Sequence, residues 1–561
     1  MKQVSVFKTG LYLALAGLVG LQVACSSSSD SGPASAAISG SVVAAPVSGA
    51  SVQLKDAAGN ALADAVTTGS DGSYSVTVTG AMPDALVLES TGGTYSDEAS
   101  GAATDAGMLM AYVDGASMSA GGELHATPAS TIVSKMVMTH GMTLTDAQAA
   151  FESAFGFAAD TATAPADATA PVADATEEEL LAGLRAAVFS QLTKDLGLAP
   201  TEQFDLLAAL AEDLADGELD GEGVSGAISV TTSVMLPIDI QSRFSQALVA
   251  FHTSANNKTG LLNNQIGIIP FAKVTLTDSY KIEYVSDIMP MQGKSMFKLR
   301  ISDKDTGAAV SENVTLMLMM YMEDREHSTP DLNCKESLTT AGEYDCTVYY
   351  LMPSVMATGD SMGYWQINVM DKANKQSAML YPQVMMAMGD TTRVALKGQA
   401  GDDTIMMMGE EVSRTYNLFK ESLMGNTGNH TFEVFIAPME TMMSFPALET
   451  GIALIIDPAA DPVTTFPINT VTVEFSTDET NWTPANNAVN GSGIWSASID
   501  SLTDGVEGKI YVRLSVNNEL KTTDGKVPGV ITDVNGDPIL DENNDPIPNT
   551  YNIFKVTPGG M

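Results

Sequence analysis

The sequence predicts a mainly β, multidomain protein that carries one α-helical subdomain after its first β-domain. Apolar and polar residues alternate between turn-forming residues in 37–126 and again after residue 270, which predicts half-buried strands. Between these two regions the leucines recur at helical spacing. A chain of 561 residues is long enough for several domains of this kind.

Residues 1–24 have the pattern of a cleaved secretion signal. A short basic stretch precedes an apolar run, residues 11–24, that is too short to span a bilayer. Residues 21–25, which end in Cys25, resemble a bacterial lipobox. This resemblance implies that Cys25 becomes an acylated N-terminus, that residues 25–36 form a Ser-rich tether, and that the outer membrane holds the protein. Plain secretion, with Cys25 removed in the signal peptide, is the alternative.

The charge of the chain excludes one class of partner. The sequence holds 68 acidic and 27 basic residues, which gives a formal net charge of −41 at pH 7. Such a surface repels the phosphates of nucleic acids and the headgroups of anionic lipids. We therefore expect no nucleic-acid partner, and we expect the lipid anchor to provide the contact with the bacterial membrane.

Cys334 and Cys346 are the two cysteines that remain once Cys25 carries the anchor. An even pair of cysteines in an oxidising compartment predicts a disulfide. Closing a loop of this length stabilises a fold by about 3 kcal/mol. Two free thiolates that bind a metal are the alternative.

Residues 37–126 are predicted to form a small β-sandwich, because turn signals separate short period-two strands such as 74–78. A spaced pattern runs through this region, and its residues are Gly40, Val42, Val47, Gly49, Ala50, Val52, Thr67, Thr68, Asp71, Gly72 and Tyr74. The pattern resembles the carboxypeptidase regulatory-like domain. The resemblance implies a spacer or binding module without catalytic residues.

Residues 127–260 are predicted to form the helical subdomain. Thr176 and Glu179 have the spacing of a capping box, and Leu180, Leu184 and Leu192 belong to an apolar stripe behind it. The Ala/Pro/Thr/Asp composition of 158–175 is typical of a disordered linker. The region is similar to the helical module that follows such β-domains in secreted bacterial proteins.

Residues 270–391 are predicted to form an Ig-like β-sandwich, because strand patterns recur between polar turns at the spacing of that fold. This region also begins a methionine-rich part of the chain: 22 of the 32 methionines lie between Met289 and Met443. Thioethers are soft ligands that select Cu(I), and they are also flexible fillers of apolar cores.

A Met-rich strand and a histidine in this domain precede a Gly-x-Tyr strand and a Gly-x-Trp strand. The residues of the pattern are Met317, Met319, Met320, Met322, His327, Pro330, Gly342, Tyr344, Met352, Pro353, Gly363, Trp365 and Val369. The pattern resembles the FixH-like and YtkA-like group of exported β-sandwiches, which is associated with copper handling. The resemblance implies a Cu(I) site whose candidate ligands are Met317, Met319, Met322, His327 and Met352.

Strand geometry limits the copper hypothesis. On a strand Met317 and Met319 face one way and Met320 and Met322 face the other, so a cluster needs a further group such as Met352. One alternative is that methionines fill the core of a chain with only 6% aromatic residues. The other alternative is a sacrificial surface that reacts with oxidants.

A second methionine-rich β segment, 392–457, and a C-terminal β-sandwich, 460–561, complete the predicted domains. The C-terminal region looks like a bacterial Ig-like repeat of surface proteins, on the strand-like runs 471–476 and 510–514 and the Gly493-x-Trp495 motif between them.

A tandem of acidic loops lies near the C-terminus. Each half places oxygen side chains at alternate positions, as in the first three ligand positions of a calcium loop. Neither half has the usual glycine and closing glutamate, so a solvated turn is the alternative to calcium. The candidate ligands are Asp533, Asn535, Asp537, Asp541, Asn543 and Asp545.

The sequence favours a binding or structural role over catalysis. It contains no nucleophile elbow, zinc-protease helix, phosphate loop or dinucleotide fingerprint. Its five histidines are scattered, which leaves few candidates for a general base. We therefore expect a non-enzymatic, lipid-anchored envelope protein that binds an envelope protein or polymer. A periplasmic copper-handling protein is the alternative, and Cu(I) and calcium are the two cofactors that the sequence suggests.

Overall fold

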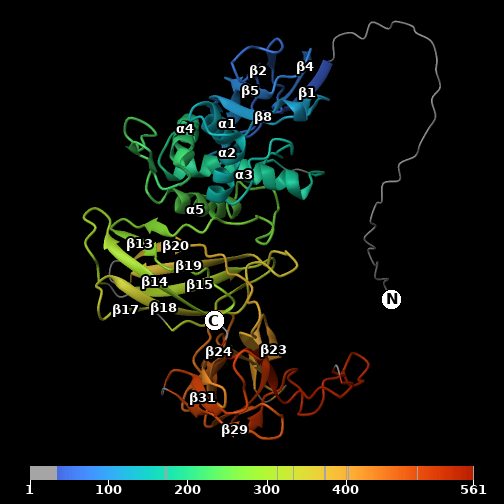
Figure 1. The fold of residues 1–561 in the computed structure, drawn as a ribbon, viewed down its shortest axis with the longest axis vertical. Coiled ribbons are helices and arrows are strands. Elements are labelled where there is room, and N and C mark those ends of the chain that lie inside the picture. Colours follow the sequence, from blue (N-terminus) through green and yellow to red (C-terminus); the bar gives the residue numbers. More distant parts are fainter. Residues whose placement is uncertain are drawn as a thin grey trace, which may run out of the picture.

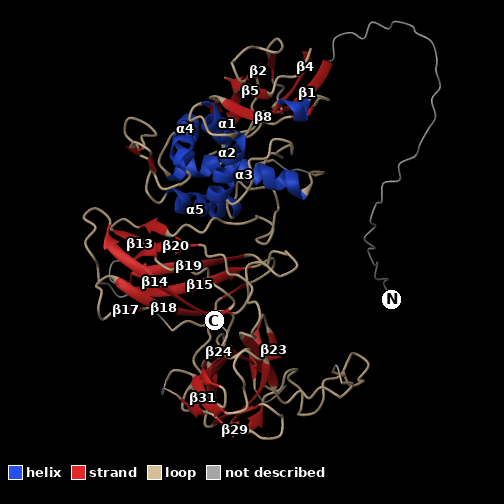
Figure 2. Cartoon of the chain, viewed as in Figure 1, coloured by secondary structure: helices blue, strands red, loops and turns tan. Residues whose placement is uncertain are grey.

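Three bodies follow one another along the long axis of the molecule in the computed structural model (Figure 1). The first combines strands with helices and the other two consist of strands (Figure 2), so the predicted mainly β class is confirmed. The structure describes residues 35–170, 173–311, 314–332, 334–371, 375–399, 401, 403–488, 491–541 and 543–559. The predicted signal peptide, Cys25 and most of the tether lie outside these ranges. Among the described residues, no helix is long and apolar enough to cross a membrane.

The first body begins with two sheets that enclose an apolar layer. Its strands are β1 (Ser35–Ser41), β2 (Ser51–Asp56), β3 (Val66–Thr67), β4 (Ser73–Thr79), β5 (Ala85–Thr91), β6 (Thr94–Ser96), β7 (Ala103–Asp105), β8 (Leu109–Asp114) and β9 (Gly122–Glu123). One sheet has the order β4-β1-β9 and the other β3-β2-β5-β8, while β6 and β7 form a hairpin. The hydroxyl of Tyr74 donates to the carbonyl oxygen of Leu124 at 2.6 Å. A Cβ atom on Gly40 would lie 1.9 Å from the same oxygen, so glycine is required there.

The α-helices of the first body are α1 (Pro128–Met138), α2 (Leu144–Phe155), α3 (Glu177–Asp195), α4 (Gln203–Asp213) and α5 (Ile240–His252). A short hairpin, β10 (Glu222–Gly223) and β11 (Gly226–Ala227), lies between α4 and α5. The predicted capping box begins α3: the Thr176 hydroxyl accepts from the Glu179 amide, and the Glu179 carboxylate accepts from the Thr176 amide.

The sandwich and the helices share one apolar core. Val52 and Leu88 of the sandwich belong to the same buried cluster as Phe155 and Phe244 of the helices. The two regions are therefore one folded unit, where the sequence predicts a sandwich and a separate helical subdomain. The described residues of the predicted linker 158–175 also pack into this unit, because neighbouring elements satisfy their backbone groups.

Three hydrogen bonds hold that segment. The His125 amide donates to the Thr161 carbonyl at 2.8 Å, the Ala166 amide to Glu179 at 3.0 Å, and the Lys258 amide to Ala168 at 2.7 Å. Ala168 is itself buried. The segment contains few large apolar residues, and backbone hydrogen bonds to residues outside the segment hold it in place instead.

The second body is a two-layer β-sandwich. Its strands are β12 (Val274–Leu276), β13 (Tyr280–Tyr284), β14 (Gly293–Asp303), β15 (Val314–Tyr321), β16 (Glu326–His327), β17 (Lys335–Glu336), β18 (Glu343–Tyr350), β19 (Tyr364–Asp371) and β20 (Gln376–Leu380). The sheet orders are β12-β13-β14-β18-β17 and β16-β15-β19-β20. Alternate residues of both sheets, including Phe297, Leu318, Val348 and Trp365, form the core between them.

The third body is a second, larger sandwich. Its strands are β21 (Arg393–Lys397), β22 (Thr404–Met407), β23 (Glu410–Ser413), β24 (Thr415–Asn426), β25 (Asn429–Pro438), β26 (Ala453–Asp457), β27 (Thr464–Pro467), β28 (Val471–Ser476), β29 (Thr483–Pro484), β30 (Asn486–Asn487), β31 (Ile494–Ile499), β32 (Gly508–Val516), β33 (Glu519–Leu520) and β34 (Asn552–Val556). The main sheets are β21-β24-β25-β31-β30 and β29-β28-β32-β33, with β34 on β32.

This topology corrects the predicted division between 392–457 and 460–561. β25 of the first segment pairs with β31 of the second, and one apolar cluster runs from Val394 to Val556. The two segments are one domain because each supplies strands to the same sheet, a pairing between distant residues that strand periodicity does not reveal.

Apolar contacts close both junctions between the bodies. The ring of Tyr349 on β18 stacks on Phe435 of the third body with the centroids 4.2 Å apart, and it lies 5.3 Å from Phe419. Tyr364 and Tyr381 of the second body belong to the buried cluster of the first. The three bodies therefore form a continuous stack, with the described chain beginning at the far end from the third body (Figure 1).

Candidate functional site

The predicted copper ligands lie on two faces of the sheet that contains β15. Met320 pairs in register with His327 and with Trp365, and all three lie toward the core of the second body. Met322 packs against the same core. Met317, which is 41% exposed, and Met319 alternate with these residues and point away from His327. This placement separates Met317 and Met319 from the rest of the predicted ligand set.

His327 and Met352 are brought together by the fold. The His327 Nε2 atom lies 3.2 Å from the Met352 Sδ atom, and its Nδ1 atom lies 2.7 Å from the carbonyl oxygen of Ser328. His327 is buried, and its ring meets Trp365 edge to face at 5.5 Å between centroids. The Trp365 indole N–H donates to the carbonyl oxygen of Met352 at 3.1 Å, which fixes that turn beside the imidazole.

The tautomer of His327 follows from these distances. A carbonyl oxygen only accepts, so Nδ1 must carry the hydrogen that Ser328 receives. Burial lowers the pKa of the His327 imidazole, which favours the neutral ring. The lone pair of Nε2 therefore points at the thioether sulfur of Met352. Two soft or borderline Lewis bases that face each other without a hydrogen between them are suited to a shared soft cation such as Cu(I).

Met320 and Trp365 belong to the sequence pattern that predicts the copper site, but neither is among the predicted ligands, and the structure places both beside His327. Met320, on the inner face of β15, is fully buried and lies opposite His327 in the ladder, and Met322 follows the end of the strand and packs against the same core. The alternation of the strand already divides the methionines in this way. The spacing of the residues in the sequence does not show that the loop after β18 brings Met352 next to His327.

Methionines in the wider block are not confined to the core. Ten of the 22 are exposed, namely Met289, Met291, Met296, Met317, Met356, Met385, Met388, Met408, Met424 and Met443. Met319 and Met320 are buried. Filling of the core therefore accounts for a part of the block, and a further part presents thioethers to solvent, where oxidants reach them.

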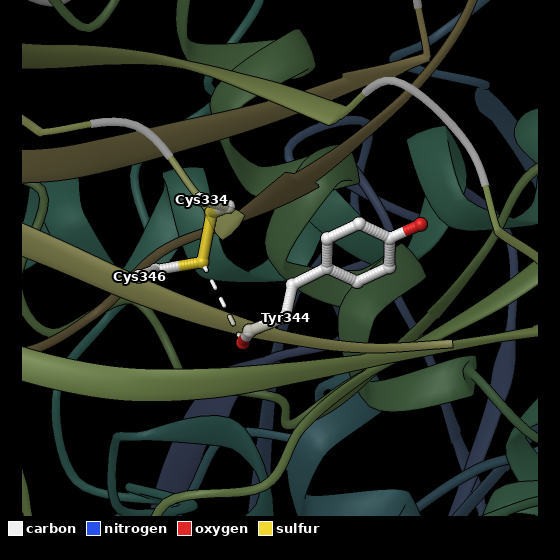
Figure 3. Close-up of a disulfide and its surroundings, with 3 residues drawn as sticks. All are labelled: Cys334, Tyr344 and Cys346. Carbon is white, nitrogen blue, oxygen red and sulfur yellow. Dashed lines mark hydrogen bonds between the residues drawn. A yellow bond between two sulfur atoms is a disulfide. The ribbon is translucent and has the colours of Figure 1, made fainter. Parts of the chain in front are cut away.

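The predicted disulfide is confirmed: Cys334 and Cys346 are bonded to each other (Figure 3). Cys346 lies on β18, and Cys334 immediately precedes β17, the edge strand that pairs with β18. The Cys346 sulfur lies 3.9 Å from the carbonyl oxygen of Tyr344 (Figure 3). The disulfide links the start of the edge strand β17 to β18. Neither cysteine of this pair is therefore a free thiolate that could bind a metal.

The acidic tandem forms two exposed turns. An oxygen of Asp533 accepts from the amides of Asn535 and Asp537 at 2.8 and 2.9 Å, and Asp541 accepts from Asn543 and Asp545 in the same way. Backbone amides thus use the oxygens that calcium would need, and a turn role accounts for these residues. Within the described ranges, no group of three His, Cys, Asp or Glu side chains is placed to hold a metal ion.

A cleft of about 150 Å³ lies in the first body between α3 and the segment before it. The Arg185 guanidinium in this cleft stacks on the ring of Phe157 at 4.7 Å. Burial lowers the pKa of Arg185 to about 10, and Asp160 opposes that change. Asp160 and Glu178 also line the cleft, so two carboxyl groups accompany the one guanidinium there.

The comparisons with known proteins do not show a family. No family description and no curated relative matches the chain. Solved structures with a partial likeness include titin domains z1z2 in complex with telethonin, at 11% identity over 43% of this chain and 91% of that one, with a TM-score of 0.12. The Yersinia pseudotuberculosis adhesin InvE shares 12% identity over 44% of this chain and 56% of its own, with a TM-score of 0.14. The Escherichia coli adhesin FdeC shares 13% over 44% and 62%, with a TM-score of 0.14. TM-scores this low carry no weight for the fold, which rests on the sheets described above.

Proposed function

We propose that this protein is a non-enzymatic lipoprotein of the cell envelope, anchored through Cys25, that acts as a modular binding or structural surface protein. The observation that carries the proposal is the continuous stack of three bodies, with the described chain beginning at one end and the third body at the other. Such a stack holds its far end at a fixed distance from the anchor, because buried apolar contacts close both junctions.

The histidines support a role without catalysis. Four of the five are engaged in local structure: His125 contacts Ser41, His252 contacts Asn263, His327 contacts Met352, and His430 contacts Asp504. A general base needs an imidazole that reaches a substrate. The partner we propose is an envelope protein or polymer, which the exposed loops of the third body contact.

A photo-cross-linking experiment tests this role. A photoreactive amino acid replaces Val534, which is fully exposed in the third body, or Val224, which is 86% exposed in the first. We expect irradiation of intact cells to give a discrete adduct from position 534 and none from position 224. Absence of adducts from position 534 and from a second exposed site of the third body, Met408, would contradict a binding role for that body.

A copper-handling role is the second candidate, and the observation that favours it is the lone pair of His327 aimed at the Met352 sulfur. His327 and Met352 would hold Cu(I), and Met320, opposite His327, and Met322 offer further thioethers on the core side. Cu(I) bound there would be shielded from solvent by Trp365 and the core.

Titration of the purified chain with Cu(I) against a competing chelator tests this candidate. We expect one tightly bound ion, lost in Met352→Leu and in His327→Leu. Met317→Leu is the matched control, because that sulfur points away from the imidazole, and it should retain the ion. No retention by the wild type, or equal loss in the control, would refute the site.

A further inference from the structure

Four ionisable side chains meet in the interior of the third body. Asp403, Arg414 and Lys521 are all fully buried. The Lys521 Nζ atom lies 2.8 Å from Asp403 Oδ2 and 3.0 Å from the Glu519 Oε1 atom. An amine that touches two carboxylates in a fully buried position is rare, because each buried charge needs compensation.

The surroundings of the pair are dry and aromatic. The Lys521 Nζ atom lies 5.2 Å from the ring centroid of Tyr416 and 5.8 Å from that of Phe466. The Arg414 Nε–H donates to Asp403 Oδ1 at 2.8 Å, and the Tyr416 hydroxyl donates to Asp403 Oδ2. Both oxygens of the carboxyl thus carry a donor, while the amine lies against one of them.

We propose that Lys521 and Asp403 condense to an intramolecular amide between Nζ and Cγ. The three parts that such a reaction needs are present: a nucleophile in contact with the carboxyl, a carboxylate that receives its proton, and donors on both carboxyl oxygens. Removal of water from the site favours the condensation, since water is its product.

The atoms balance without any other reactant. Glu519 takes one proton from the Lys521 ammonium, and the free amine attacks Cγ of Asp403. Arg414 stabilises the negative charge that develops on Oδ1. Oδ2 then leaves as water, with the proton returned by Glu519 and a second proton from Nζ. One C–N bond forms, one C–O bond breaks, and an ammonium and a carboxylate become a neutral amide and a water molecule.

The rest of the network tolerates this product. Arg414 keeps three carbonyl acceptors, those of Met439, Thr404 and Ile455, at 3.0 to 3.2 Å. Glu519 keeps the Gln399 amide at 2.7 Å. The amide would join positions 118 residues apart. It would tie the segment after β33 to the loop before β22, so the two halves of the third body could not separate without breaking a covalent bond.

Peptide mass spectrometry of the full-length protein tests the proposal. After reduction and trypsin digestion, we expect one branched peptide that contains both Asp403 and Lys521, is lighter than its two components by one water molecule, and is uncut after Lys521. Recovery of the two linear peptides, with cleavage after Lys521, would overturn the proposal whatever the variants show.

Two variants identify the chemistry. Glu519→Gln keeps the size and the partly exposed position of the side chain and removes the proton acceptor, so we expect the branched peptide to fall at least tenfold. Lys521→Arg keeps a buried cation and should abolish it. A branched peptide at wild-type yield in Glu519→Gln would overturn the assigned role of Glu519. Gln265→Glu, in the first body, is the processing control and should give the wild-type yield.

Discussion

Tyr349 is the residue whose replacement tests most clearly how the second and third bodies are joined. It is fully buried, its ring stacks on Phe435 and packs near Phe419, and its hydroxyl donates to Glu421 at 2.7 Å. Tyr349→Ala removes the whole ring from a site that both bodies build. Truncation of a buried aromatic side chain costs about 3–5 kcal/mol. Tyr349→Phe removes only the hydroxyl and its hydrogen bond to the Glu421 carboxylate, which should cost about 1.5–3 kcal/mol.

Hydrogen exchange measured by mass spectrometry resolves the effect body by body. Each 1.4 kcal/mol changes an opening constant about tenfold, so Tyr349→Ala should raise exchange by at least about 100-fold. We expect this rise in peptides of both β18 and β24, since the ring belongs to both cores. Leu338→Ala, at a fully exposed position, is the control and should leave exchange unchanged. A rise confined to β18 would show that the two bodies do not share a core at this junction.

Three further predictions concern single bodies. Cys346→Ser should lower the stability of the second body by about 3 kcal/mol, read as a lower urea midpoint for Trp365 fluorescence, and reductant should have no further effect on the variant. Burial, and next the neighbouring Asp97, holds the pKa of the Glu98 carboxyl well above its usual range. Its contribution to stability is present below the unfolded pKa and is lost as pH rises through the folded one. Glu98→Gln should therefore flatten the fall in the melting temperature of the first body from acidic to alkaline pH, and an unchanged slope would contradict this. Gly40→Ala should destabilise that body by about 3 kcal/mol, because its Cβ meets a backbone oxygen, whereas Gly529→Ala should be neutral in thermal unfolding.

Local features of the fold follow directly from the sequence. The capping box at Thr176, the half-buried strand 73–79 and the disulfide of Cys334 and Cys346 each depend on residues close together in the chain. The face of β15 that carries each methionine also follows from strand alternation. These features are set by short-range geometry, so pattern alone is enough to predict them.

Features that depend on distant pairing do not follow from pattern. β25 meets β31 across an intervening segment, and so the boundary near residue 460 was misplaced. Asp403 and Lys521 lie 118 residues apart, and nothing at either position marks the contact. The segment 158–170 has a disordered composition but is held by backbone bonds from other elements. In each case the residues that determine the structure are far apart in the sequence, whereas hydrophobic periodicity is read from short stretches of neighbouring residues.

The identity of the N-terminal residue tests the central proposal most directly. The protein is extracted from membranes with detergent, and its N-terminal peptide is identified by mass spectrometry. The proposal predicts a peptide that begins at Cys25 and carries acyl chains, together with loss of membrane association in Cys25→Ser but not in Ser26→Ala. An unmodified N-terminus beyond residue 25, in protein recovered from the soluble fraction, would contradict it.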